Sequence, residues 1–262
     1  MLKVIDHGDV NEFAFSTRLS RAAGIKVSVF RIRGTLVDTG FSRVRDELAT
    51  ALESHPIDRA VVTHWHEDHS GNLGLLADRR IPTLVTPRTG ELVPGTRSLP
   101  FYRWAIWGSP SQSPLPPTSD SLDLEIIPTP GHSEDHIALW DPSSETVFGG
   151  DLFLGVRACT IHPSEDPYAT LVSVRRVLEL RPKRFFDAHR GSIADPVGTL
   201  TAKADWLATA LGEVERGLDR GDSDVRIRSQ VLGGEDGTTW VSGGQMSKLN
   251  FVRAVRRARQ SR

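Results

Sequence analysis

Residues 61–71, VVTHWHEDHSG, place three histidines and one aspartate within six positions, directly after a short β-branched run. Alternate side chains of an extended segment point the same way, so His64 and His66 face one point together. Asp68 and His69 follow where the strand must give way to a turn and a helix. Imidazoles and carboxylates at this density are typical ligands of metal ions. The stretch therefore predicts a metal site.

Two metal ions need about four ligands each, counting shared groups and water, so other ligands must come from later in the chain. His132, Asp151 and His189 each follow an apolar segment and stand beside small residues that leave room for an ion. A ligand set without thiolate favours two zinc ions, and it also admits iron or manganese.

The chemistry predicted from such a pair of ions is hydrolysis. A water held between two cations has its pKa lowered to about 7, and the same cations polarise the bond that it attacks. Asp68 is the predicted catalytic residue, because its carboxylate can take a proton from the attacking water and return it to the leaving group.

Alternating strands and helices are needed to position these residues. The β-branched and aromatic residues of 25–40 predict a hairpin, and Val44, Leu48 and Leu52 predict an amphipathic helix over 43–54. Further strands are expected at 58–63, 82–87, 122–131, 136–141, 145–153 and 183–189, and further helices at 72–80, 168–180 and beyond 199. This order predicts an α/β fold in which the second half repeats the alternation of strands and helices seen in the first.

Residues 94–118 break this pattern, because they are rich in proline and serine and carry several aromatic side chains. We expect a long loop near the site, in which Tyr102, Trp104 and Trp107 wall a substrate pocket. The alternative is that these rings anchor the loop to the body of the protein.

Composition limits the partners. Lys and Arg number 32 against 33 Asp and Glu, so the net charge gives no general attraction to nucleic acid or membrane. Residues 245–262 hold six Lys or Arg and no acid, so nucleic acid is a possible partner only through this segment. No run of 18 apolar residues predicts a membrane span. The single cysteine, Cys159, excludes an internal disulfide, and we expect a cytoplasmic protein that acts on a small molecule.

The segments THWHEDHSG, TPGHSEDH, GGDLF and DAHRG, preceded by LVDTG, resemble in their order the motifs of the metallo-β-lactamase fold superfamily. The resemblance covers most of residues 1–195 and implies a four-layer αβ/βα sandwich, a catalytic domain over 1–195 and a helical, basic appendage over 196–262. By the same resemblance Asp38 lies behind the ligands. The implied sites are one metal on His64, His66 and His132, another on Asp68, His69 and His189, and Asp151 bridging the two.

Asp151 also indicates which branches of the superfamily the sequence resembles. The best-known β-lactamases carry cysteine or serine at the corresponding place, which argues against antibiotic hydrolysis. The aspartate resembles that of glyoxalase II-like thioesterases, lactonases and nucleases, so we expect hydrolysis of a small ester, thioester or lactone. Two alternatives stay open: an RNA phosphodiesterase like the small lactamase-like endoribonucleases, and an oxygen-using enzyme with one iron, similar to persulfide dioxygenases.

Overall fold

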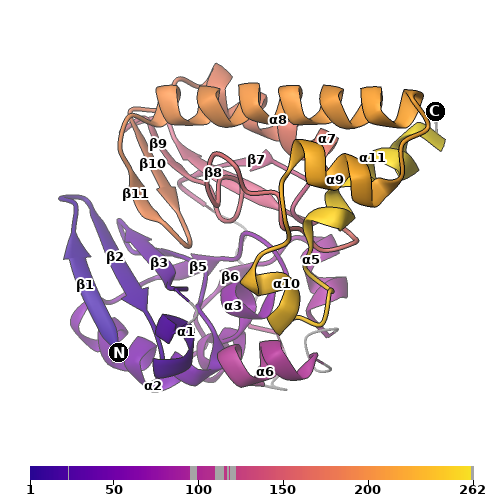
Figure 1. Ribbon diagram of the computed structural model, residues 1–262. Helices are drawn as coiled ribbons and strands as arrows, with labels where there is room; N and C mark the ends of the chain where they lie inside the picture. The colour runs from indigo at the N-terminus through magenta and orange to yellow at the C-terminus, as the bar shows by residue number, and fades with distance from the viewer. Residues whose placement is uncertain (23, 95–98, 110–114, 117, 119–121, 261–262) are drawn as a thin grey trace.

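Two β-sheets face each other at the centre of the molecule, and helices cover the outer face of each sheet (Figure 1). The computed structural model describes the whole chain except residues 23, 95–98, 110–114, 117, 119–121 and 261–262. The first sheet has the strand order β1-β2-β3-β4-β5-β6, and the second has the order β11-β10-β9-β8-β7. The four-layer αβ/βα sandwich expected from the sequence is therefore confirmed.

The first sheet is formed by the N-terminal half of the chain. Its strands are β1 (Leu2–Asp6), β2 (Val10–Phe15), β3 (Val27–Ile32), β4 (Thr35–Val37), β5 (Arg59–Val61) and β6 (Thr83–Leu84). The connecting helices are α1 (Arg18–Ala22), η1 (Ser42–Val44), α2 (Arg45–Ser54), α3 (Glu67–Ser70), α4 (Leu73–Asp78), α5 (Pro87–Leu92) and α6 (Phe101–Trp107). Strands β4, β5 and β6 pair in parallel, while β1 to β4 pair antiparallel.

The second sheet and its covering helices follow. The strands are β7 (Glu125–Pro128), β8 (Ile137–Asp141), β9 (Thr146–Phe148), β10 (Arg184–Asp187) and β11 (Gly191–Ile193). The helices are α7 (Pro167–Glu179), α8 (Pro196–Asp219), α9 (Asp224–Val231), α10 (Gly237–Val241) and α11 (Lys248–Gln260). Strands β7 and β9 both run antiparallel to β8, and β10 runs parallel to β9, so the carboxyl ends of β7, β9 and β10 share one edge.

The period of two along the strands explains the layering. In β3, Val27 and Val29 pack with the helices outside the first sheet, whereas Phe30 and Ile32 pack against the second sheet. Both faces of the strand are buried, so both sets of side chains are apolar. The same rule holds in the second sheet, where Phe186 enters the core between the sheets.

Of the C-terminal helices, α8, α9 and α11 belong to the outer layer of the second sheet. Leu200, Leu207 and Leu211 of α8 share one apolar core with Val147 of β9 and Phe185 of β10. Figure 1 shows α8 lying along the outer side of this sheet. The boundary expected at residue 195 therefore runs along a packed interface.

The expected hairpin within 25–40 and the helix over 43–54 are present as β3, β4, η1 and α2. The expectation of a loop throughout 94–118 was wrong, because residues 101–107 form helix α6. Pro100 precedes its first turn, and Gly108 ends it with a φ of 82°. The rest of this segment lies partly outside the described residues. Among the described helices, none is long and apolar enough to span a membrane.

Candidate metal centre

Seven imidazole and carboxylate side chains gather where strand ends of both sheets meet. The loop after β5 and helix α3 supply His64, His66, Asp68 and His69, while segments after β7, β9 and β10 supply His132, Asp151 and His189. They form two groups, His64 with His66, His132 and Asp151, and Asp68 with His69 and His189. Within each group, the atoms that could hold an ion lie within 4.8 Å of one another.

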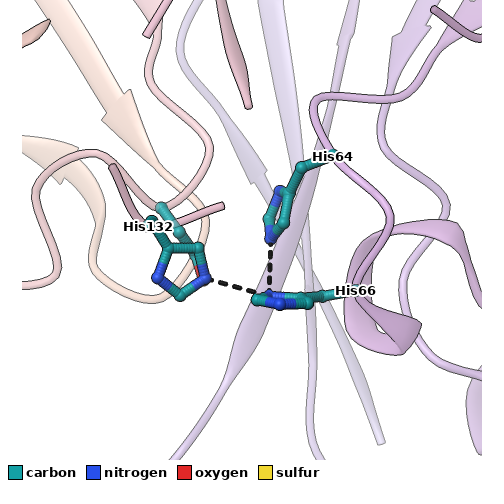
Figure 2. Close-up of side chains that lie close together, drawn as sticks. His64, His66 and His132 are labelled. Carbon is teal, nitrogen blue, oxygen red and sulfur yellow. Dashed lines mark hydrogen bonds and ion pairs between the residues drawn. The ribbon is translucent and has the colours of Figure 1, made fainter. Parts of the chain in front are cut away.

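Three imidazole nitrogens of the first group converge on one point. Nδ1 of His66 lies 3.0 Å from Nε2 of His64 and 2.9 Å from Nε2 of His132 (Figure 2). One proton on Nδ1 can satisfy only one of these two neighbours, so the remaining lone pairs face each other. A cation at this point would be shared by all three nitrogens.

Asp151 lies between the two groups. Its Oδ1 is 3.3 Å from Nε2 of His69, and its Oδ2 is 3.3 Å from Nε2 of both His132 and His189. Asp68 closes the second group, with Oδ2 3.4 Å from Nε2 of His189 and 3.9 Å from Nε2 of His69. Asp151 thus faces imidazole nitrogens of both groups, the place from which a carboxylate could bridge two ions.

Two atoms at this junction point to a missing partner. Nε2 of His69 and Oδ1 of Asp151 are buried 3.3 Å apart; within the described part of the chain this contact does not meet hydrogen-bond geometry, and neither atom makes a hydrogen bond elsewhere. A buried polar atom without a partner carries a free-energy penalty of about 1–3 kcal/mol. Divalent cations held by nitrogen and oxygen ligands would remove that penalty, so the residues present fit a dinuclear metal site.

The charges of the site are unevenly distributed. Burial works against ionisation of Asp151, but His189 and His69 outweigh it and hold the pKa of that carboxyl well below its usual range. Burial likewise opposes the charged form of His69, yet Asp151, Asp38 and Asp68 raise its pKa well above the ordinary value. Burial, with His69 and His66 nearby, lowers the pKa of His64 well below that of a free imidazole. His64 is therefore unprotonated and could offer a lone pair to a cation, which the carboxylates would attract.

Hydrogen bonds from behind fix the orientation of the ligands. Asp38 accepts a hydrogen bond from Nδ1 of His69 at 2.8 Å, which directs Nε2 toward the junction. Its other oxygen accepts from the backbone N–H of Thr63 at 2.7 Å. Glu165 lies 3.1 Å from Nδ1 of His132 in the same manner. The expected place of Asp38 behind the ligands agrees with this geometry, whereas Glu165 was not anticipated.

The backbone around Asp151 has little room. Gly150 has a φ of 50°, and a Cβ there would lie 2.7 Å from Nε2 of His136 and 3.0 Å from Oγ1 of Thr63. His136 Nε2 accepts the backbone N–H of Asp151 at 3.0 Å, and burial lowers the pKa of His136 to about 3. A neutral His136 therefore positions Asp151 through the backbone N–H of that residue.

An ion pair links helix α6 to the metal-binding loop. Nε and Nη2 of Arg103 donate to the two carboxylate oxygens of Glu67 at 2.5 and 2.6 Å. Glu67 is 1% exposed and follows His66 directly in the chain. Neither residue was predicted, because alternation turns Glu67 away from the ligands and the partner is distant in sequence.

A cavity of about 440 Å³ opens beside the ligands. It contacts His66, Asp68, His132 and Asp151 on one side. The remaining lining residues are Ile25, Tyr102, Arg103, Ile106, Trp107, His162, Glu165, Gly237, Thr238, Val241 and Met246. Its volume is in the range of small-molecule sites, which run from about 300 to 1,000 Å³.

Two of the three predicted aromatic residues line this cavity. Tyr102 also donates a hydrogen bond to Oε1 of Gln245 at 2.6 Å, and Trp107 packs against Phe41 in the core. Trp104 does not line the cavity; it is 44% exposed and lies beneath the guanidinium of Arg43. Residues 104 and 107 are three positions apart in α6, so the directions of their side chains coincide only in part. Trp107 faces the cavity, whereas Trp104 faces outward.

The comparison with family models agrees with this geometry. The model of the Metallo-beta-lactamase superfamily matches residues 28–189, more than half of the chain. The chain belongs to this superfamily. A metallo-beta-lactamase from Pontibacter korlensis has the same fold, with a TM-score of 0.62 and 18% identity over 79% of this chain and 99% of that one.

Relatives within the superfamily are distant. Beta-lactamase-like protein 2 homolog of Drosophila melanogaster is 25% identical over 187 residues, which cover 64% of this chain and 58% of the relative. Atrochrysone carboxyl ACP thioesterase of Claviceps purpurea is 25% identical over 246 residues, covering 82% of this chain and 72% of the relative. The chain thus spans less than two thirds of the fly protein.

Proposed function

We propose that this member of the superfamily is a dinuclear metal-dependent hydrolase of a small ester, thioester or lactone. The observation that carries the proposal is the meeting of two ligand groups at Asp151, on the wall of a cavity of small-molecule size. Zinc is the metal we propose, because nitrogen and carboxylate oxygen donors without thiolate suit it.

Two divalent cations, when bound, would lower the pKa of a water molecule and polarise the bond under attack. The protein's own residues supply the rest. Asp68 lines the cavity, and although burial opposes its ionisation, His69 and His189 lower the pKa of its carboxyl far enough to keep it anionic at neutral pH. An anionic Asp68 can accept the proton of the attacking water on a carboxylate oxygen and pass it to the leaving group.

An acyl substrate fits the cavity better than RNA does. Apolar side chains form much of its wall, including Ile106, Val241 and Met246. The basic C-terminal segment offers less free charge than its sequence suggests, because Arg256 pairs with Asp224 and Arg259 pairs with Asp219. The name of the fungal relative, an ACP thioesterase, is consistent with cleavage of a thioester.

The proposal is tested with metal-free protein reloaded with zinc, manganese or iron, and a panel of a fluorogenic thioester, a lactone and a single-stranded RNA. We expect metal-dependent cleavage of the thioester or lactone, lowered about 10²–10⁴-fold by Asp68→Asn. Asp205→Asn, on the exposed side of α8, is the matched control and should have no effect. Cleavage of RNA alone, or persulfide-dependent oxygen uptake with one iron per chain, would contradict the proposal.

A further inference from the structure

Two overlapping hollows open beside the candidate metal centre, and their walls differ where they do not overlap. One is the cavity described above. Ile25, Trp107 and Met246 line both hollows, whereas Ile106 and Val241 line this cavity alone, and we call the part beside Ile106 and Val241 the apolar chamber. The other is a hollow of about 700 Å³ that reaches the same Asp68, His132 and Asp151. The cationic side chains on its wall are Lys26, Arg157, Arg190 and Lys248, and we call this wall the cationic groove.

The apolar chamber has no spare positive charge among its described lining residues. Arg103 is the one lysine or arginine among the described residues that line this cavity, and its guanidinium is paired with the carboxylate of Glu67. A phosphate or carboxylate in this chamber would therefore lack a counter-charge, whereas an uncharged apolar group would bury its surface against Ile106 and Val241.

The cationic groove, by contrast, keeps its charge. Nε of Arg190 donates to the carbonyl of Leu154 at 2.9 Å, and Nζ of Lys248 donates to the carbonyl of Leu232 at 3.2 Å. Carbonyl oxygens orient these cations without neutralising them. Arg157 is exposed and makes no ion pair with any described residue.

Acidic groups offset this charge only in part. Lys26 is paired with Glu12 at a distance of 3.3 Å. Apart from the ligands Asp68 and Asp151, Asp236 is the acidic residue among the described lining of the groove. Its carboxylate accepts from Oγ1 of Thr160 at 2.5 Å and from the backbone N–H groups that begin α10. Three cations therefore face one carboxylate that is already bonded.

We infer that the cleft takes an acyl thioester or ester with an apolar acyl group and an anionic leaving group, phosphate-bearing or carboxylate-bearing. The inference rests on the proposed function and adds the orientation of the substrate. The acyl group occupies the apolar chamber, the scissile carbonyl lies at the metal centre and the leaving group lies along the cationic groove. Hydrolysis forms a bond from water oxygen to the carbonyl carbon, breaks the bond to the leaving group and yields a carboxylate, a proton and the free thiol or alcohol.

Binding of uncleavable thioethers tests the orientation independently of catalysis. The probes are the decyl and methyl thioethers of coenzyme A, of glutathione and of neutral N-acetylcysteamine, and their affinities are measured calorimetrically on the metal-loaded protein. We expect the thioethers of coenzyme A and glutathione, which are anionic, to bind at least about tenfold more tightly than those of neutral N-acetylcysteamine. This preference should fall as the salt concentration rises. Coenzyme A and glutathione distinguish a phosphate-bearing from a carboxylate-bearing leaving group.

Two variants separate the two spaces. Val241→Asp should weaken the decyl thioethers by about tenfold or more and leave the methyl thioethers unchanged, because it places a charge in the apolar chamber. Its control is Trp240→Asp, since Trp240 is 80% exposed and adjacent in α10 but is not a lining residue. Arg157→Glu should weaken the binding of the anionic thioethers alone. Arg175→Glu, on the exposed face of α7, is its control.

The outcomes distinguish the inference from the proposed function. Equal affinity for neutral and anionic thioethers, or equal effects of Val241→Asp and Trp240→Asp, would overturn the orientation. Tight binding of single-stranded RNA that is lost in Arg157→Glu and kept in Val241→Asp would overturn it as well. If thioethers bind as expected and the corresponding thioesters are not cleaved, the proposed hydrolysis fails while the assignment of the two spaces stands.

Discussion

Metal ions and protons compete for the same atoms in this site. The carboxylates of Asp68 and Asp151 attract positive charge, and in the metal-free protein they raise the pKa values of His69 and His189 well above that of a free imidazole, against the effect of burial. Metal binding therefore releases protons and weakens as the pH falls. The groups behind the ligands decide which nitrogen is free to bind.

Asp38 gives the clearest residue-scale prediction. Its φ of 65° is tolerated by asparagine, so Asp38→Asn removes the negative charge behind His69 and keeps the backbone. We expect zinc affinity to fall about 10–100-fold, because a less basic His69 is a poorer ligand. Competition against a chromophoric chelator measures the affinity, with Asp46→Asn in the exposed first turn of α2 as control. Unchanged affinity would show that Asp38 serves only the fold.

Lys203 gives a prediction about pH. Its side chain is 3% exposed and donates to the carbonyls of Phe153 and Gly155, and burial lowers its pKa from 10.5 to about 8. Between those values the unfolded chain binds more protons than the folded one, so stability due to Lys203 rises with pH. At about 1.4 kcal/mol per pKa unit the rise is about 3 kcal/mol.

Denaturant unfolding of the wild type and Lys203→Met at several pH values between 8 and 10.5 checks this sign. The wild type should gain stability relative to the variant across that interval, because methionine carries no titrating group. Parallel curves would mean that Lys203 keeps an ordinary pKa in the folded protein.

The elements of this fold differ in how far the sequence determines them. Helix α2 was predictable because Val44, Leu48 and Leu52 repeat at helical spacing and all three are buried. Helix α6 was missed because its residues FYRWAIW show no alternation of apolar and polar side chains, and flanking prolines suggested a loop. Strand β11, Gly191–Ile193, is too short to carry a period of its own.

The residues of the candidate site also differ in how far the sequence predicts them. The cluster from His64 to His69 and the strand-end positions of His132, Asp151 and His189 carry local signals, so the sequence brought them together correctly. Glu67, Arg103 and Glu165 depend on pairings between distant segments, which no local pattern encodes. Supporting residues are therefore found only when the fold is known.

The pair of Glu67 and Arg103 supports an element-scale prediction. Burial raises the pKa of Glu67, against the pull of Arg103, so the carboxylate depends on its partner. Arg103→Met should destabilise the protein by about 3–5 kcal/mol, since it leaves a buried carboxylate unpaired. Denaturant unfolding measures the loss, and the double variant Glu67→Gln with Arg103→Met should recover part of it.

An exposed ion pair is the control for this prediction. Arg88 pairs with Glu91 at 2.6 Å and with Glu134 at 2.5 Å, and the three side chains are 49%, 65% and 60% exposed, so Arg88→Met should leave the stability nearly unchanged. Equal costs for Arg88→Met and Arg103→Met would mean that the contact between α6 and the metal-binding loop is not held by charge.

At the scale of the whole molecule, the ligands join two halves of the chain. The first sheet and its loops contribute His64, His66, Asp68 and His69, and the second contributes His132, Asp151 and His189. Between the sheets, Phe30 of β3 contacts Phe148 and Phe186 of the second sheet, so one apolar core already unites them. Bound metal should therefore stabilise a single cooperative unit.

Removing the metal tests whether it stabilises the two halves of the chain as one cooperative unit. At free metal about a hundredfold above its Kd, each of the two sites adds about 2.7 kcal/mol, and at roughly 2–4 °C per kcal/mol a chelator should lower the Tm by about 10–20 °C. Calorimetry should show one transition before and after chelation, because ligands from both sheets lose the ion together. His132→Asn should lose much of the shift, whereas His55→Asn, at the end of α2 and in neither ligand group, should keep it. A Tm indifferent to chelation would contradict a metal shared by the two halves, and two separate transitions would show that the sheets unfold independently.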